Sequence, residues 1–520
     1  MNGAQTLVHT LLDAGVDTCF ANPGTSEMHF VAALDRVEGM KCVLGLFEGV
    51  VTGAADGYYR IAERPATTLL HLGPGLANGL ANLHNARKAR SGIVNIIGEH
   101  ATSHLSLDAP LTSDIETLAR PMSSWVRTIN SQDRLAEDGR DAVIQAAGRP
   151  GKIASLILPA DLAWSNMNDL PQSMCVVNQP APEAVDHEAV ITAAKILKYH
   201  GDSVLLLLGG RAVRANATEW AGRVAASTGC SIMSEFYAER IERGAGRVAI
   251  PRLPYSVQGA LKTLSHFDHI ILVNAAEPVA FFAYPDKPGR LAAPHTKIIS
   301  LSNHEQDPVE VLRMLCEEVG GMRIQPTTLS LIDYSSAYEE GPVTPASIGA
   351  LLGTLIPENA IVVDEAISTG RTFDQATRNA APHDWLTNMG GSIGFGLPVA
   401  IGAAIAAPDR RVIALEGDGS AMYTLQSLWT MAREGLNVTV IIFANRQYQI
   451  LQGEYAQVGA GAPGSRANDM LSIDRPALDW VALSSGHGVP ACRVSSLGQF
   501  ADAVRRASRS EGPSLIELLL

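Results

Sequence analysis

Two polar loops of the sequence could together bind a metal ion and a diphosphate. The apolar stretch 411–416 is typical of a buried strand and runs into Gly-Asp-Gly-Ser at 417–420, and the next apolar strand runs into Asn445. Because the carboxyl ends of parallel strands joined by one helix lie side by side, we expect Asp418 and Asn445 to meet at one sheet edge. Their side-chain oxygens and the backbone carbonyl of Gln447 suit Mg²⁺, which completes its octahedron with phosphate and water. The residues that we expect at the diphosphate are Gly417, Asp418, Gly419, Ser420 and Asn445.

These two loops together resemble the signature of thiamine diphosphate enzymes. Four further segments are similar to segments of that family, in the same chain order: 22–25 (Asn-Pro-Gly-Thr), 47–49 (Phe-Glu-Gly), 54–58 (Ala-Ala-Asp-Gly-Tyr) and 390–398 (Gly-Gly-Ser-Ile-Gly-Phe-Gly-Leu-Pro). The matches run through almost the whole chain. They most resemble the decarboxylase and acetohydroxyacid synthase branch, which includes benzoylformate decarboxylase and the acetolactate synthase large subunit.

The resemblance implies thiamine diphosphate and Mg²⁺ as cofactors and gives roles to single residues. Glu48 would hydrogen-bond the pyrimidine N1′ and favour the imino tautomer, whose nitrogen removes the proton from thiazolium C2. The carbonyl of Gly391 would accept from the aminopyrimidine, and Ile393 would be the wedge that bends the cofactor and brings its reacting atoms together. Ser368 would contact the diphosphate. We expect FAD to be absent, because residues 203–324 contain no feature that argues for it.

Histidines decide how far the resemblance extends to the reaction. His71 follows a predicted strand at 67–70 and matches an active-site histidine of benzoylformate decarboxylase, and imidazole suits proton transfer near neutral pH. The second histidine of that decarboxylase aligns with Phe-Phe-Ala-Tyr at 281–284, so its role is unfilled or reassigned. His100 or the nearby His104 could take over that role, and His100 is the residue that we name as a catalytic candidate. The residues that we expect to contact substrate are Thr25, His71, Tyr448 and Leu451.

Alternating strand and helix patterns must position these residues. Such alternation predicts mostly parallel sheets that are covered by helices on both faces. Stretches at 170–183 and 325–344 lack periodicity and indicate linkers. We therefore expect an α/β fold with three doubly wound domains. By resemblance these are a pyrimidine-binding domain at 1–170, a central dinucleotide-fold-like domain at 184–325 and a diphosphate- and Mg²⁺-binding domain at 343–520.

Composition excludes several classes of protein. A chain of 520 residues is too long for one hydrophobic core. Its 40 Lys and Arg against 53 Asp and Glu give a net charge of -13, so we expect no nucleic-acid partner. The first residues lack the basic start and apolar core of a signal peptide, and no apolar run is long enough to cross a bilayer. We expect a cytoplasmic protein with no membrane partner.

We interpret the sequence as that of a thiamine diphosphate- and Mg²⁺-dependent lyase that acts on a small 2-oxo acid. It would release CO₂ through an enamine intermediate and give an aldehyde or a carboligation product, as in benzoylformate decarboxylase. Residues 73–78 are closer to acetohydroxyacid synthases, so an acetolactate synthase-like carboligase that joins two 2-oxo acids is the alternative. A catalytically silent α/β nucleotide-binding protein is a third hypothesis, which Glu48, Asp418 and Asn445 disfavour. The family's cofactor spans two subunits, which implies at least a homodimer and favours a homotetramer.

Overall fold

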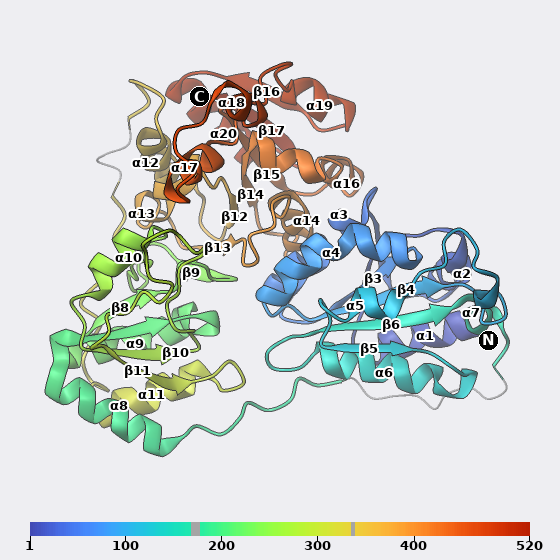
Figure 1. The fold of residues 1–520 in the computed structure, drawn as a ribbon, viewed down its shortest axis with the longest axis horizontal. Helices are drawn as coiled ribbons and strands as arrows, with labels where there is room; N and C mark the ends of the chain where they lie inside the picture. The colour runs from blue at the N-terminus through green and yellow to red at the C-terminus, as the bar shows by residue number, and fades with distance from the viewer. Residues whose placement is uncertain (168–176, 334–337) are drawn as a thin grey trace.

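The computed structural model describes residues 1–167, 177–333 and 338–520 and contains three sheets flanked by helices (Figure 1). The first unit is blue to cyan in Figure 1, the middle unit is green to yellow, and the third unit is dark yellow to red. This arrangement confirms the expected α/β fold with three mostly parallel sheets. Parts of both predicted linkers lie outside the described residues. Among the described residues, no helix is both long and apolar enough to span a membrane.

The sheet of the first unit has six parallel strands, and helices cover both of its faces. The strand order is β2 (Lys41–Leu44), β1 (Thr18–Asn22), β3 (Ala66–Leu70), β4 (Ile93–Glu99), β6 (Ile153–Pro159) and β5 (Trp125–Thr128). The helices are α1 (Gly3–Asp13), α2 (Met28–Arg36), α3 (Glu48–Ala62), α4 (Leu72–Lys88), α5 (Ile115–Ala119), α6 (Leu135–Ala146) and α7 (Ala160–Trp164). Strands β3, β4 and β6 are buried along their whole length, as two-sided coverage requires.

The sheet of the middle unit has four parallel strands. Their order is β11 (Lys297–Ser302), β10 (His269–Val273), β7 (Val204–Leu208) and β8 (Ser231–Ser234). The helices are α8 (His187–His200), α9 (Ala215–Thr228), α10 (Val257–Leu264) and α11 (Pro308–Glu318). Strand β7 consists of Val and Leu only and is wholly buried, which accounts for its apolar sequence.

The sheet of the third unit has seven strands, and one of them comes from the middle part of the chain. The order is β16 (Ala491–Val494), β17 (Ser514–Leu519), β15 (Val438–Ala444), β14 (Val412–Gly417), β12 (Ile361–Glu365), β13 (His383–Thr387) and β9 (Ile241–Arg243). Its helices include α12 (Pro345–Leu355), α13 (Phe373–Ala376), α14 (Gly396–Ala406), α15 (Asp418–Ala421), α16 (Ser427–Arg433), α17 (Gln449–Gln457), α18 (Ser465–Met470), α19 (Trp480–Gly486) and α20 (Leu497–Arg509). Strand β9 pairs antiparallel with β13, so the region 184–325 forms its own four-stranded sheet and also contributes one strand to the third sheet.

Helices α3 and α14 join the first and third units through a contact between small residues. A Cβ atom added to Gly57 would lie 2.1 Å from the carbonyl oxygen of Val399. A Cβ atom added to Gly402 would lie 1.9 Å from the carbonyl oxygen of Ala54. The two helix backbones therefore approach so closely that only glycine fits at these positions, and this contact fixes how the two sheets face each other.

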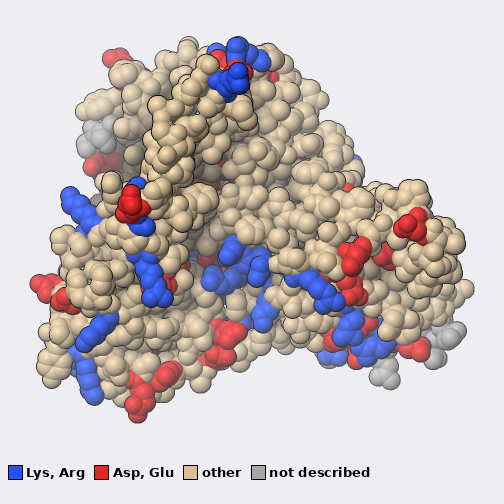
Figure 2. All heavy atoms as spheres, viewed as in Figure 1, with Lys and Arg blue, Asp and Glu red and all other residues tan. Residues whose placement is uncertain are grey.

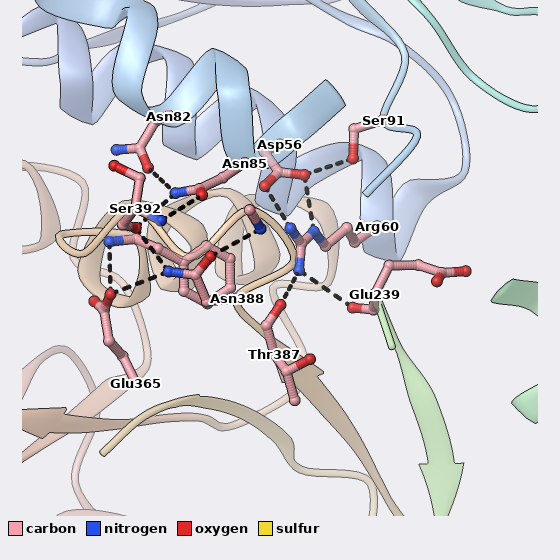
Figure 3. Close-up of polar contacts among 12 residues, drawn as sticks. Asp56, Arg60, Asn82, Asn85, Ser91, Glu239, Glu365, Thr387, Asn388 and Ser392 are labelled. Atoms are coloured by element: carbon pink, nitrogen blue, oxygen red, sulfur yellow. Dashed lines mark hydrogen bonds and ion pairs between the residues drawn. The ribbon is translucent and has the colours of Figure 1, made fainter. Parts of the chain in front are cut away.

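Arg60 connects all three units from a buried position (Figure 3). Its Nε and Nη2 atoms donate to the two carboxylate oxygens of Asp56 at 2.8 and 2.7 Å. Its Nη1 atom donates to the carbonyl of Thr387 in the third unit at 2.7 Å and to that of Glu239 in the middle unit at 3.3 Å. Ser91 also donates to Asp56. Because a buried charge is stable only when it is paired and hydrogen-bonded, this network holds the three units in one arrangement.

Candidate active site

The carboxyl ends of β2 and β3, the two strands on either side of β1, bring Glu48 and His71 together. Glu48 is the first residue of α3, and its buried carboxylate accepts a hydrogen bond from Asn78 Nδ2 at 3.0 Å. His71 lies between β3 and the start of α4. A Cβ atom added to Gly75 would lie 3.1 Å from Glu48 Oε1 and 3.3 Å from the Cβ of His71. The two predicted residues thus flank the same glycine, although they belong to different loops.

Glu27 is a site residue that sequence reasoning missed. Its Oε2 atom lies 2.7 Å from His71 Nδ1 and accepts from the backbone N–H of Gly24 at 2.8 Å. The Glu27 side chain is 1% exposed, whereas that of His71 is 23% exposed. A carboxylate bonded to one ring nitrogen orients the imidazole and leaves the other nitrogen for proton transfer. The available signal was a glutamate three residues after Gly24, which is the spacing of a helix-capping residue.

The loop that contains Thr25 packs directly on His71. A Cβ atom added to Gly24 would lie 2.2 Å from His71 Nδ1, and Thr25 itself is exposed. His100 follows β4, where its backbone N–H donates to Glu99 Oε1 at 2.7 Å. Its ring packs against that of His104, with 5.4 Å between the ring centroids. Its buried Nε2 atom has no hydrogen-bond partner among the described residues, so the imidazole can accept or donate there.

Asp418 and Asn445 meet at the ends of the adjacent parallel strands β14 and β15. Asp418 Oδ2 accepts from the backbone N–H of Arg446 at 2.6 Å, and its Oδ1 accepts from that of Gly419 at 3.0 Å. The Asn445 Oδ1 atom accepts from the N–H of Gln447 at 3.1 Å. Burial raises the pKa of Asp418 to about 6, and a bound cation would offset this desolvation of the carboxylate. One carboxylate beside an amide oxygen therefore fits the oxygen ligands that Mg²⁺ prefers.

The Gly-Asp-Gly-Ser sequence forms the end of β14 and the start of the short helix α15. Ser420 Oγ donates to the carbonyl of Gly417 at 3.0 Å. A Cβ atom added to Gly419 would lie 2.6 Å from Tyr448 Cε1, so the Tyr448 ring covers this glycine. Within 1–167, 177–333 and 338–520, no group of three His, Cys, Asp or Glu side chains could hold a metal ion. The mixed oxygen set at Asp418 and Asn445 is therefore the candidate metal site.

Side chains from two units hold the loop of residues 390–396, the 390–396 loop (Figure 3). Glu365 accepts from the backbone N–H groups of residues 394, 395 and 396 at 3.1, 3.2 and 2.8 Å. Asn388 Oδ1 accepts from those of residues 390 and 391 at 3.1 and 2.8 Å. From the first unit, Asn82 of α4 donates to the Gly394 carbonyl at 3.2 Å. Most polar groups of this loop backbone are thereby occupied.

Two residues of the 390–396 loop retain free backbone groups, and both have an expected role at the cofactor. Gly391 is expected to accept from the aminopyrimidine, and Ile393 is expected to be the wedge that bends the cofactor. Among the described residues, no hydrogen bond reaches the carbonyl of Gly391 or the backbone of Ile393. Gly391 has a φ of 77°, and a Cβ atom there would lie 2.8 Å from Phe281 Cζ. A free acceptor beside the half-buried apolar Ile393 side chain fits a heterocycle that carries an amino group.

Two buried glutamates lie beneath this loop, and sequence reasoning missed them as a pair. Glu365 and Glu416 are register partners on β12 and β14. Burial raises the pKa of Glu365 to about 7. Burial and the neighbouring Glu365 carboxyl also raise the pKa of Glu416 well above its usual value. Because two adjacent buried carboxylates cannot both ionise cheaply, the pair retains a proton near neutral pH.

Three further predicted residues of the third unit, Ser368, Tyr448 and Leu451, are half-buried or exposed. Ser368 is half-buried, and its side chain makes no capping hydrogen bond to the short helix that follows it. Tyr448 directly precedes α17, a helix without any buried residue, and burial raises the pKa of Tyr448. The Leu451 side chain on α17 is 47% exposed. Ser368, Tyr448 and Leu451 are therefore accessible to a ligand.

A cavity of about 390 Å³ lies between the first and middle units and is lined by several arginines, among them Arg149 and Arg214. Figure 2 shows basic side chains gathered in this part of the surface. The Gly-Gly turn after β7 lies near it, but a Cβ atom at Gly209 would be only 2.1 Å from Glu235 Oε2. Burial raises the pKa of Glu235 to about 7. This carboxyl group therefore packs directly against the Gly209 turn.

The sequence of this chain matches known protein families and individual relatives. Residues 1–118 match the model for the thiamine pyrophosphate enzyme N-terminal TPP binding domain, and residues 368–518 match that for the C-terminal TPP binding domain. A Mycobacterium tuberculosis protein described as "Putative acetolactate synthase large subunit IlvX" is 47% identical, covering 100% of this chain and 99% of the relative. The benzoylformate decarboxylase of Pseudomonas aeruginosa is 28% identical, with 97% and 96% covered.

Among solved structures, the thiamine diphosphate-dependent 4-hydroxybenzoylformate decarboxylase of Rhodococcus jostii has a TM-score of 0.82 and 25% identity, covering 99% of this chain and 98% of its own. The fold and the two matched domains define a thiamine diphosphate-binding protein. The chain belongs to the thiamine pyrophosphate enzyme family and is related both to benzoylformate decarboxylases and to acetolactate synthases.

Proposed function

We propose that this protein decarboxylates a small 2-oxo acid with thiamine diphosphate and Mg²⁺ and releases an aldehyde or a carboligation product. The observation that carries the proposal is the arrangement around Gly75, where His71 lies next to the Glu48 carboxylate. His71 is at the same time bonded to the buried Glu27. An oriented imidazole beside the carboxylate that serves the pyrimidine is what proton transfer to and from a decarboxylated substrate requires.

Each residue of the site would have a separate task. Thiamine diphosphate, when bound, supplies the nucleophilic carbon and the electron sink for decarboxylation. Glu48 would hydrogen-bond the pyrimidine, and the Gly391 carbonyl would accept from its amino group. Asp418 and Asn445, with the Gln447 carbonyl, would hold Mg²⁺ and through it the diphosphate. The residues that would complete the cofactor site are Ile393, Ser368, Gly417, Gly419 and Ser420.

Around the reacting atoms, His71 would move the proton of the substrate, and Glu27 would keep its imidazole in one orientation. Thr25, Tyr448 and Leu451 would form the walls of the substrate pocket. His100 is a second proton-transfer candidate, supported by its buried and unpartnered Nε2 atom. These walls come from the first and third units and are separate from the proposed cofactor ligands, so they can select the substrate without altering the cofactor contacts.

A second candidate function is the joining of two 2-oxo acids. It is supported by the 47% identity to the Mycobacterium tuberculosis relative and by residues 73–78. A silent nucleotide-binding protein is disfavoured, because the buried Asp418 carboxylate is costly without a cation. The absence of FAD stays a prediction. The homodimer or homotetramer and the cytoplasmic location stay predictions.

One experiment separates these functions. The protein is incubated with thiamine diphosphate, Mg²⁺ and a panel of 2-oxo acids, while CO₂ is followed and the products are identified. Aldehyde supports the decarboxylase, and acetolactate from pyruvate supports the carboligase. Absence of calorimetric binding of the cofactor would refute both. His71→Ala should slow the reaction by about 10²–10⁴-fold if His71 is the acid–base group.

A further inference from the structure

Asn85 on α4 pairs with Ser392 in the 390–396 loop through both of its amide atoms (Figure 3). Its Nδ2 donates to the Ser392 carbonyl at 2.8 Å, and its Oδ1 accepts from the Ser392 N–H at 3.1 Å. Asn85 is fully buried, and its Nδ2 also donates to Asn82 Oδ1 at 3.0 Å. A planar amide that uses a donor and an acceptor on one residue fixes both the position and the orientation of that residue.

Ser392 lies between Gly391, whose carbonyl is expected to accept from the aminopyrimidine, and Ile393, which is expected to be the wedge that bends the cofactor. The Gly391 carbonyl has no hydrogen-bond partner in the described ranges, and neither has the backbone of Ile393. Because consecutive peptide planes share a Cα atom, a contact that fixes Ser392 also directs the Gly391 carbonyl and the Ile393 side chain. Among the described residues of its own unit, the Ser392 carbonyl accepts only from Asn388, at 2.7 Å, so Asn85 supplies the link to the first unit.

Asn82, three residues earlier on the same face of α4, connects the same elements. Its Nδ2 donates to the Gly49 carbonyl at 2.8 Å and to the Gly394 carbonyl at 3.2 Å. The residue that follows Glu48 is thereby joined to the 390–396 loop. One face of α4 thus determines how the loop is seated against the first unit.

We propose that Asn85 is a positioning residue of the cofactor site. Its paired contact with Ser392 holds the Gly391 carbonyl and the Ile393 side chain in the geometry that binds thiamine diphosphate, although Asn85 does not touch the cofactor. This inference rests on the proposed function. It differs from a purely structural role, because loss of the contact should weaken the binding of the cofactor and not only the stability of the fold.

The test is a calorimetric titration of thiamine diphosphate into the full-length protein at saturating Mg²⁺. Asn85→Ala should bind the cofactor about tenfold more weakly than the wild type, because both contacts to Ser392 are lost. The matched control is Asn95→Ala. Asn95 is equally buried in β4 and makes two side-chain hydrogen bonds, to Thr68 and Ser155, but none to the 390–396 loop. Asn95→Ala should bind thiamine diphosphate as the wild type does, even if its melting temperature falls as much as that of Asn85→Ala.

Asn85→Asp is the conservative variant, because it keeps the acceptor for the Ser392 N–H and loses the donor. Its second oxygen would face two acceptors, the Ser392 carbonyl and Asn82 Oδ1, so this variant should also bind the cofactor more weakly than the wild type. It remains informative if Asn85→Ala does not fold, as judged by circular dichroism. In steady-state assays, the apparent KM for thiamine diphosphate should rise, whereas kcat at saturating cofactor should change much less.

Wild-type affinity in the folded Asn85 variants would overturn the inference and leave the proposed function standing. Equal weakening in Asn95→Ala would also overturn it, because the effect would then be general destabilisation. A wild-type protein that binds no thiamine diphosphate would overturn the proposed function, and this inference with it.

Discussion

Replacing Glu27 by glutamine should slow catalysis without preventing substrate or cofactor binding. The Glu27 carboxylate accepts from the Gly24 N–H and bonds His71 Nδ1, which leaves His71 Nε2 as the free nitrogen. Both contacts are made to one carboxylate oxygen, Oε2, so a glutamine oxygen in that place can keep both of them. The neutral amide, however, lacks the charge that stabilises the imidazolium formed when His71 takes up a proton. Proton transfer through His71 should therefore become slower.

The expected magnitude follows from the geometry of this contact. The distance of 2.7 Å and the 1% exposure of the Glu27 side chain are those of a short, buried, charge-assisted hydrogen bond. Hydrogen bonds to charged groups contribute about 1.5–3 kcal/mol. Since about 1.4 kcal/mol corresponds to a factor of ten, kcat should fall by roughly 10- to 100-fold.

The assay is CO₂ release at saturating cofactor, measured for wild type, Glu27→Gln, His71→Ala and the double variant. If Glu27 acts through His71, the glutamine substitution should have little further effect when His71 is already alanine. The reasoning is refuted if Glu27→Gln keeps wild-type kcat, or if it lowers kcat by the same factor in the His71→Ala background.

Three further outcomes are expected. Glu48→Gln should abolish decarboxylation but retain thiamine diphosphate binding by calorimetry, because the proposed metal and diphosphate ligands lie in the third unit; an unchanged rate contradicts the role of Glu48. Burial and Arg243 lower the pKa of His383 to about 3 from 6.5, so the unfolded chain takes up a proton that the folded chain does not as pH falls below 6.5. The free energy of unfolding should therefore drop by about 2 kcal/mol between pH 7 and 5 on account of His383 alone. In urea unfolding, His383→Phe should lose less stability than the wild type as the pH falls. If both proteins show the same dependence of unfolding free energy on pH, His383 is not the group responsible. Arg60→Leu should lower the free energy of unfolding by about 3–5 kcal/mol, because it leaves Asp56 buried without its partner. A loss below about 1 kcal/mol in urea unfolding would show that Arg60 does not hold the units together.

The sequence by itself determined the type of fold and the identity of the loops at the strand ends. Strand and helix patterns alternate along the chain, and each apolar strand ends in a polar turn, so Asp418 and Asn445 could be placed at adjacent strand ends. The handedness of the connection between β14 and β15 makes such neighbours predictable from local pattern. The resemblance of 47–49 and 390–398 to known segments added Glu48, Gly391 and Ile393, whose family roles are not visible in residue type alone.

Only the tertiary structure decided which side chains meet across these loops. Glu27 and His71 are 44 residues apart, and Asn85 and Ser392 are 307 apart. Strand β9 joins the third sheet through antiparallel pairing with β13, which no local signal around Ile241–Arg243 indicates. Periodicity reports which face of an element is buried, but it does not report the order of strands or the packing of one unit on another. Contacts between loops depend on that order and packing, and for this reason they emerged only with the folded chain.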